Sequence, residues 1–204
     1  EWKLDIVASG SQKGYMIPPG LSFISMSKKA WEAVEKSNLP KFYLNLKSYR
    51  KSLLSNSNPY TPAVNLVFAL DEALKMMREE GLDNIFQRHN KHKLAMSNAV
   101  KALNLKLFAD EKYLSPSITA IKTEGIDAEE FRKTIKNNFD ILLAGGQDHL
   151  KGKIFRVGHL GYVNDRDIIS VVSAISNTLL SLGKISAQQA GEALVVASKY
   201  LEGN

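Results

Sequence analysis

SGSQKGYMIPPG, residues 9–20, places a single lysine among small and polar residues, between two short apolar runs. The run at 4–8 is apolar enough for a buried β-strand, and the run at 20–26 alternates as a strand with one apolar face does. Lys13 is therefore expected on the loop between two strands, with its stem partly desolvated. Such an amine can lose its proton and form a Schiff base with a carbonyl group, although a solvated loop lysine is the commoner alternative.

Three motifs carry a resemblance to one enzyme family. They are SGSQK at 9–13 with PPG at 18–20, NPYTPAV at 58–64, and IFRVGHLG at 154–161. In this order they resemble the class V aminotransferases, specifically the serine–pyruvate and alanine–glyoxylate aminotransferase group, some of whose relatives carry a soluble hydrogenase subunit label. The resemblance implies an α/β fold of type I and pyridoxal 5′-phosphate (PLP) held on Lys13.

The first and second motifs each contain a residue that the resemblance links to the cofactor phosphate. It implies that Gln12 and Thr61 hold this phosphate, with Thr61 reaching into the site of a neighbouring subunit. A hydroxyl beside a helix N-terminus adds a directed donor to backbone amides that favour anions. Many relatives have a tyrosine three residues before this threonine, where this chain has Asn58, and Tyr60 lies next to Thr61 instead. Thr61 and the proline after it can also serve simply to begin a helix.

The third motif places Arg156 between two apolar residues in a strand that is otherwise suited to burial. A guanidinium group in that position needs a carboxylate partner. From the residues alone, this partner is another side chain of the protein. The resemblance implies instead that Arg156 grips the α-carboxylate of an amino-acid substrate through two parallel hydrogen bonds.

The composition excludes several other kinds of protein. The chain has 204 residues and a net charge of +6, without a basic run that would predict nucleic-acid binding. It has no cysteine, which excludes thiolate metal sites and cysteine nucleophiles, including the cysteine that desulfurases use. His89 and His92 are three residues apart, but a solvated helix face is a better interpretation than a metal site without a third ligand. No apolar run is long enough for a membrane span, so we expect a soluble, cytoplasmic protein.

The periodicity predicts two domains. On the family's pattern, residues 1–81 form the C-terminal part of a large PLP-binding domain with a long connecting helix, and residues 82–204 form a small α/β domain with a mostly antiparallel sheet. Gly145 and Gly146 are expected in a turn rather than a phosphate loop. Helices are predicted at 27–37, 63–81, 83–103, 127–138, 165–182 and 186–201, and further extended segments at 42–46, 117–123, 140–144 and 153–157.

The resemblance implies a chain about twice this length, with the lysine motif near its middle. We therefore expect a companion polypeptide that carries the N-terminal half, and a second copy of the whole unit across a two-fold interface. The expected reaction is PLP-dependent transamination between a small amino acid, alanine or serine, and a 2-oxo acid, glyoxylate or pyruvate. The alternatives are another PLP enzyme of this fold, such as a lyase or desulfurase, and a non-catalytic subunit that has kept the fold.

Overall fold

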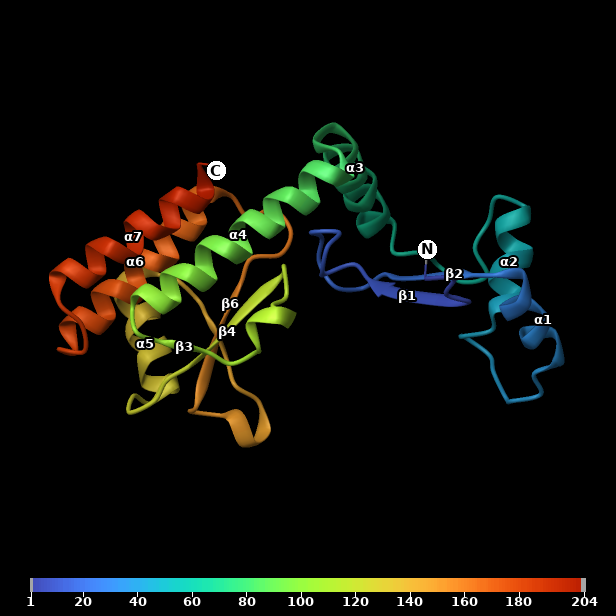
Figure 1. Cartoon of the computed structure of the whole chain (residues 1–204). Helices are drawn as coiled ribbons and strands as arrows, with labels where there is room; N and C mark the ends of the chain where they lie inside the picture. Colours follow the sequence, from blue (N-terminus) through green and yellow to red (C-terminus); the bar gives the residue numbers. More distant parts are fainter. Residues whose placement is uncertain (1, 203–204) are drawn as a thin grey trace. The chain divides into compact units, whose positions relative to one another are not determined.

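The computed structural model describes residues 2–202. Contacts between residues divide the chain into two compact units, the first ending at Glu79 and the second beginning at Glu80 (Figure 1). This division lies close to the boundary expected at residue 81. Within residues 2–202, no helix has the length and apolar character that crossing a membrane requires.

The first unit opens with a β-hairpin. Strand β1 (Ile6–Gly10) pairs with β2 (Ser22–Met26) in antiparallel register, with Ile6 opposite Met26. Both expected strands and the loop between them are confirmed, although each strand begins slightly later than the sequence indicates. The hairpin therefore holds the two ends of the Lys13 loop beside each other.

The faces of this hairpin are exposed, so the expectation that residues 4–8 are buried is wrong for this chain. Ile6 is 56% exposed and Val7 is 46% exposed, and they point to opposite faces of β1. A two-stranded hairpin is at best marginally stable without a layer packed on it. Within residues 2–79, the buried apolar side chains are Ile17, Ala30 and Ala73.

Two short helices follow the hairpin. Helix α1 (Lys28–Lys36) begins where the sequence predicts, because the Ser27 side chain accepts a hydrogen bond from the Ala30 amide. Helix α2 (Leu46–Leu54) was not predicted. The extended segment expected at 42–46 is therefore wrong: the Asn45 amide donates to the Phe42 carbonyl oxygen in a turn, and the Asn45 side chain caps α2.

The aromatic residues before α2 are exposed rather than part of a core. Phe42 is 80% exposed and Tyr43 is 58% exposed. They lie against Tyr49 and Tyr60 instead, the Tyr43 and Tyr60 rings having their centroids 4.7 Å apart. The unit ends with helix α3 (Val64–Glu80), which confirms the predicted long helix.

The second unit contains a four-stranded antiparallel sheet. Its strand order is β3 (Lys106–Leu107), β4 (Ile118–Lys122), β6 (Ile154–Gly158) and β5 (Ala144–Gly145), and every pairing is antiparallel, as expected. The strand predicted at 140–144 is reduced to the short β5. Gly145 lies in this strand instead of the expected turn, and the Leu150 backbone approaches Gly146 so closely that an added Cβ would overlap its oxygen.

The α-helices of the second unit within the described residues number four, and all four were predicted. They are α4 (Leu82–Ala102), α5 (Ala128–Phe139), α6 (Asp165–Ser181) and α7 (Ala187–Leu201). Figure 1 shows α4, α6 and α7 side by side, and α4 also contacts β3 and β4. The core lies between these helices and the sheet and includes Met96, Val100, Ile121, Ile135, Phe155, Val172, Ile175 and Leu179.

Candidate active site

The Lys13 loop is a compact turn between β1 and β2. The Met16 amide donates to the Lys13 carbonyl oxygen at 3.0 Å, and Met16 adopts a positive φ of 62°. A non-glycine residue in this region is uncommon and is found where the surrounding structure imposes it. Lys13 and Gln12 project from this turn and are exposed.

The expectation that Lys13 is partly desolvated is wrong for this chain. Its side chain is exposed because nothing in residues 2–202 covers that side of the loop. Its ammonium group forms no hydrogen bond or ion pair with any other residue of that part of the chain. The amine is therefore held on a defined backbone turn and is free to meet a ligand.

The Thr61 loop leads into helix α3. Thr61 and Asn58 are exposed, and α3 begins at Val64, so the proline at position 62 precedes the first helical residue instead of occupying it. The Thr61 hydroxyl forms no hydrogen bond within residues 2–202. Its proton is therefore available to an acceptor such as a phosphate oxygen.

Tyr60 is less available than its neighbour. Its hydroxyl donates to the backbone oxygen of Phe42 at 3.1 Å, and its ring lies against other aromatic rings. Because the phenol proton is already used, Tyr60 cannot donate that proton to a phosphate in this arrangement. Of these two neighbours, Thr61 is therefore the one whose hydroxyl proton is not used within residues 2–202.

Arg156 lies on the half-buried face of β6, between the buried residues Phe155 and Val157. Its Nε donates to the Gly145 carbonyl oxygen at 2.9 Å, which fixes the plane of the guanidinium group. No carboxylate of residues 2–202 forms an ion pair with it, so the interpretation as a structural ion pair is wrong. The terminal nitrogens stay free to bind an external carboxylate.

Small side chains flank Arg156 in the sheet. Ala120 of β4 and Ala144 of β5 lie opposite it in the two adjacent strands. Residues directly opposite each other in paired strands point to the same face, so these alanines lie beside the guanidinium stem. In the sequence, the apolar residues on either side of Arg156 indicated this site. The small neighbours could not be predicted, because they come from other strands.

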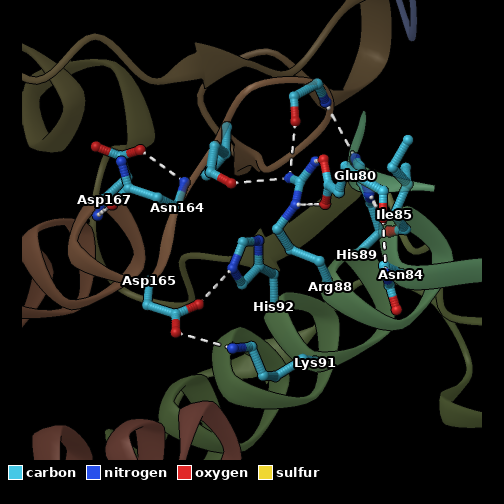
Figure 2. A network of polar contacts seen from close by, with 12 residues as sticks. Glu80, Asn84, Ile85, Arg88, His89, Lys91, His92, Asn164, Asp165 and Asp167 are labelled. Carbon is cyan, nitrogen blue, oxygen red and sulfur yellow. Dashed lines mark hydrogen bonds and ion pairs between the residues drawn. The ribbon is translucent and has the colours of Figure 1, made fainter. Parts of the chain in front are cut away.

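The two histidines of α4 are buried, so the expectation of a solvated face is wrong. His92 is fully buried and its Nε2 lies 2.9 Å from an Asp165 carboxylate oxygen, as Figure 2 shows. The Gly161 amide donates to His89 Nε2, and His89 Nδ1 lies 2.7 Å from the Ile85 carbonyl oxygen, so both ring nitrogens have partners. Within residues 2–202, no group of three or more side chains could hold a metal ion.

These histidines belong to a polar network that anchors the segment after β6 (Figure 2). Arg88 donates to the carbonyl oxygens of Gly161 and Val163, both at 2.9 Å, while its other nitrogens bind Glu80. This guanidinium group lowers the pKa of the Glu80 carboxyl group. The network therefore ties the end of the Arg156 strand to α4, a role that the sequence did not indicate.

A third buried histidine, His159, makes the stability of the second unit depend on pH. Its Nδ1 lies 3.0 Å from the Pro116 carbonyl oxygen and its Nε2 lies 2.9 Å from the Thr119 hydroxyl. Burial lowers the pKa of His159 to about 4, whereas the ordinary value is 6.5. Between these two pH values the unfolded chain binds a proton that the folded chain does not, so the stability contribution is complete above pH 6.5 and is lost as the pH falls toward 4.

We expect the free energy of unfolding to fall by up to about 3 kcal/mol across this pH range on account of His159. His159→Asn should remove most of that pH dependence, and His149→Gln should not, because His149 is exposed. Urea unfolding of each variant at several pH values measures the difference. Equal pH dependence in wild type and His159→Asn would contradict this assignment.

Comparison with known proteins relates this geometry to one family. The model of the family described as aminotransferase class-V matches residues 1–163. The chain is 55% identical to the small subunit of a soluble hydrogenase from Synechococcus and 34% identical to serine–glyoxylate aminotransferase from Methylorubrum extorquens. These matches cover 98% and 100% of this chain, respectively, and 52% of each relative. The chain therefore spans about half the length of these curated relatives.

Solved structures agree with the sequence comparison. The crystal structure of ureidoglycine–glyoxylate aminotransferase from Bacillus subtilis matches with a TM-score of 0.88 and 28% identity, over 97% of this chain and 53% of that one. The fold is thus the mixed α/β fold of about half of a fold type I PLP aminotransferase. The match of the family model to residues 1–163 and this shared fold lead to one conclusion: the chain belongs to the class V aminotransferase family.

Proposed function

We propose that this chain forms part of a PLP-dependent transaminase and supplies the lysine that binds the cofactor. The observation that carries the proposal is Lys13 itself, a free ammonium group on a tightly turned loop in a chain of this family. The family uses PLP, and its members act through a lysine Schiff base. Lys13 is the residue in the matching motif.

The residues present fit part of PLP. Lys13 provides the amine for its aldehyde, and Thr61 and Gln12 provide exposed hydrogen-bond donors for its phosphate. Asn58 is also exposed and can contribute to the phosphate contact, whereas the hydroxyl of Tyr60 is occupied. PLP enzymes also need a partner for the pyridinium nitrogen of the cofactor, and we propose none among the residues of this chain.

The proposed roles follow from the chemistry of each side chain. When bound, PLP supplies an electron sink, which accepts the electron pair left on the substrate Cα when its proton is removed. The Lys13 Nζ, once not bound to the cofactor, would take the proton from the substrate Cα and later return one, acting as a general base and acid. Gln12 of the same chain and Thr61 of the neighbouring unit would hold the phosphate in place.

Arg156 is proposed to bind and orient the substrate carboxylate. Its Nε bond to Gly145 leaves the terminal nitrogens for two parallel hydrogen bonds. We propose alanine or serine as the amino donor and glyoxylate or pyruvate as the acceptor. Several relatives are named as glyoxylate aminotransferases, and these names support glyoxylate as the acceptor.

The proposal includes two partners. A companion polypeptide carrying the N-terminal half is supported by the exposed apolar side chains of the hairpin, which a further layer of protein would cover. A second copy of the whole unit is proposed because Thr61 is to serve the neighbouring site. The names of two relatives as soluble hydrogenase subunits support a soluble protein, while a cytoplasmic location stays a prediction.

A non-catalytic subunit is the second candidate function. It is favoured by the similarity to proteins named as hydrogenase subunits, the second of which is 58% identical over 88% of this chain. A desulfurase or lyase is less suited, because the chain has no cysteine and has Gln12 where desulfurases usually have a histidine. Cofactor binding separates the transaminase from the non-catalytic subunit.

The test is to combine this chain with a companion carrying the N-terminal half and to add PLP. We expect the visible absorbance of a protein-bound Schiff base, and light scattering that gives two copies of each polypeptide. The covalent link requires Lys13, and the phosphate contact requires Thr61 of the neighbouring unit, so a lone copy is incomplete. An assembled protein without bound cofactor would favour the non-catalytic subunit, and a cofactor-loaded single copy would contradict the shared site.

A further inference from the structure

Ser11 is buried at the base of the Lys13 loop. Its side chain is fully buried, whereas Gln12 and Lys13, the next two residues, are exposed. A buried hydroxyl group is retained where it has hydrogen-bond partners, because an unpaired one costs free energy. The contacts of Ser11 therefore indicate what this side chain does for the loop.

The Ser11 hydroxyl joins two separate parts of the loop. It donates to the carbonyl oxygen of Pro18 at 2.7 Å and accepts a hydrogen bond from the Leu21 amide at 3.2 Å. The Ser11 amide also donates to the Leu21 carbonyl oxygen at 3.0 Å, and its carbonyl oxygen accepts from the Ile17 amide at 3.4 Å. One residue thus bonds the start of the loop to three positions near its end.

We propose that Ser11 is a positioning residue, whose buried hydroxyl fixes the backbone turn that presents Lys13. This inference rests on the proposed role of Lys13 as the Schiff-base lysine. The Lys13 side chain forms no hydrogen bond or ion pair within residues 2–202, so its position depends on the backbone of the loop. The hydrogen bonds of Ser11 hold the residues before Lys13 against the residues after Met16, and this constrains the turn between them.

The chemistry of serine suits this role. Alanine at position 11 would leave the Leu21 amide and the Pro18 carbonyl oxygen without their partner. Cysteine fills nearly the same space but is a weak donor and a weak acceptor. Threonine would add a methyl group at a position without free surface. Ser9 is the matched control, because it lies in the same strand region, is exposed, and forms no side-chain hydrogen bond within residues 2–202.

The experiment compares Ser11→Ala, Ser11→Cys and Ser9→Ala in the protein assembled with its companion and PLP. Hydrogen exchange of the Leu21 amide should become about tenfold faster in Ser11→Ala, which corresponds to the loss of one hydrogen bond, and should be unchanged in Ser9→Ala. The kcat for transamination should fall by about tenfold to a hundredfold in Ser11→Ala, because a small displacement of a reacting group is enough for such a loss. The KM for the amino acid should change by less than about twofold, because Arg156 binds its carboxylate.

Ser11→Cys should be intermediate in exchange and in kcat. If Ser11→Ala does not assemble, Ser11→Cys decides the question in the same way. Unchanged kcat and unchanged Leu21 exchange in the Ser11 variants would overturn the inference, as would equal effects in Ser9→Ala. If the wild-type protein forms no Schiff base on Lys13, the proposed function is wrong instead, and Leu21 exchange still decides whether Ser11 braces the loop.

Discussion

Lys13→Ala is expected to abolish covalent binding of PLP and transamination together. The variant lacks both the amine that forms the Schiff base and the base that takes the Cα proton. Loss of proton transfer alone costs about 10²- to 10⁴-fold in rate. The fold should persist, because the Lys13 side chain is exposed and forms no hydrogen bond or ion pair within residues 2–202. The free energy of unfolding should change by less than about 0.5 kcal/mol.

Three measurements on one preparation check this prediction: visible absorbance, the transamination rate and urea unfolding. Lys51→Ala is the matched control, since Lys51 is also an exposed lysine of the first unit without an ion pair among residues 2–202. The control should keep its absorbance and its rate. Full activity in Lys13→Ala would contradict the proposed function. Loss of folding would show that the Lys13 side chain stabilises the fold, which its observed bonds do not indicate.

Arg156→Lys is expected to raise the KM for the amino acid by about tenfold or more, with kcat much less affected. Lysine keeps the charge but cannot form two parallel hydrogen bonds to a carboxylate, nor keep the planar Nε bond to Gly145. The loss of one charge-assisted hydrogen bond corresponds to roughly 1.5–3 kcal/mol. Cofactor absorbance should be unchanged, because the proposed contacts of PLP come from the first unit.

Steady-state kinetics with alanine or serine as donor measures this effect. Arg166→Lys is the control, because Arg166 is an exposed arginine of the same unit with no ion pair among residues 2–202. Its KM should equal that of the wild type. An unchanged KM in Arg156→Lys would return Arg156 to a structural role, held by its bond to the Gly145 carbonyl oxygen.

Most helices and the antiparallel sheet could be predicted from the sequence, because their signals are local. Ser27 and the residues after it predict the start of α1, and the structure shows the capping bond. The apolar spacing from Leu66 onward predicts α3. Helix α2 was missed because the aromatic residues before it favour an extended chain, while its actual signal is the capping residue Asn45.

Burial was predicted less well, because it depends on what packs against each element. His89 and His92 lie among lysines in the sequence, which suggests a solvated face. In the structure that side of α4 is covered by the segment around Gly161 and Asp165, which lie more than 70 positions further along the chain. No local pattern contains this information. The reverse error occurred at residues 4–8, where an apolar strand lies exposed because nothing described in this chain covers it.

The candidate site shows the same division. Lys13, Thr61 and Arg156 were chosen from motifs, and the structure leaves each with free polar groups. The bracing by Ser11 could not be predicted, because its partners Pro18 and Leu21 are 7 and 10 positions away and depend on the path of the loop. Likewise, the bond between Arg156 and Gly145 requires β5 and β6 to pair.

The central claim is that Lys13 carries the cofactor, and borohydride reduction tests it most directly. Reduction converts a Schiff base between PLP and an amine into a stable covalent adduct, which peptide mass spectrometry then locates. In the protein assembled with its companion and PLP, we predict one pyridoxyl group per chain, on the peptide containing Lys13. A protein that binds PLP but carries the adduct on another lysine, or that carries no adduct after reduction, would contradict the claim.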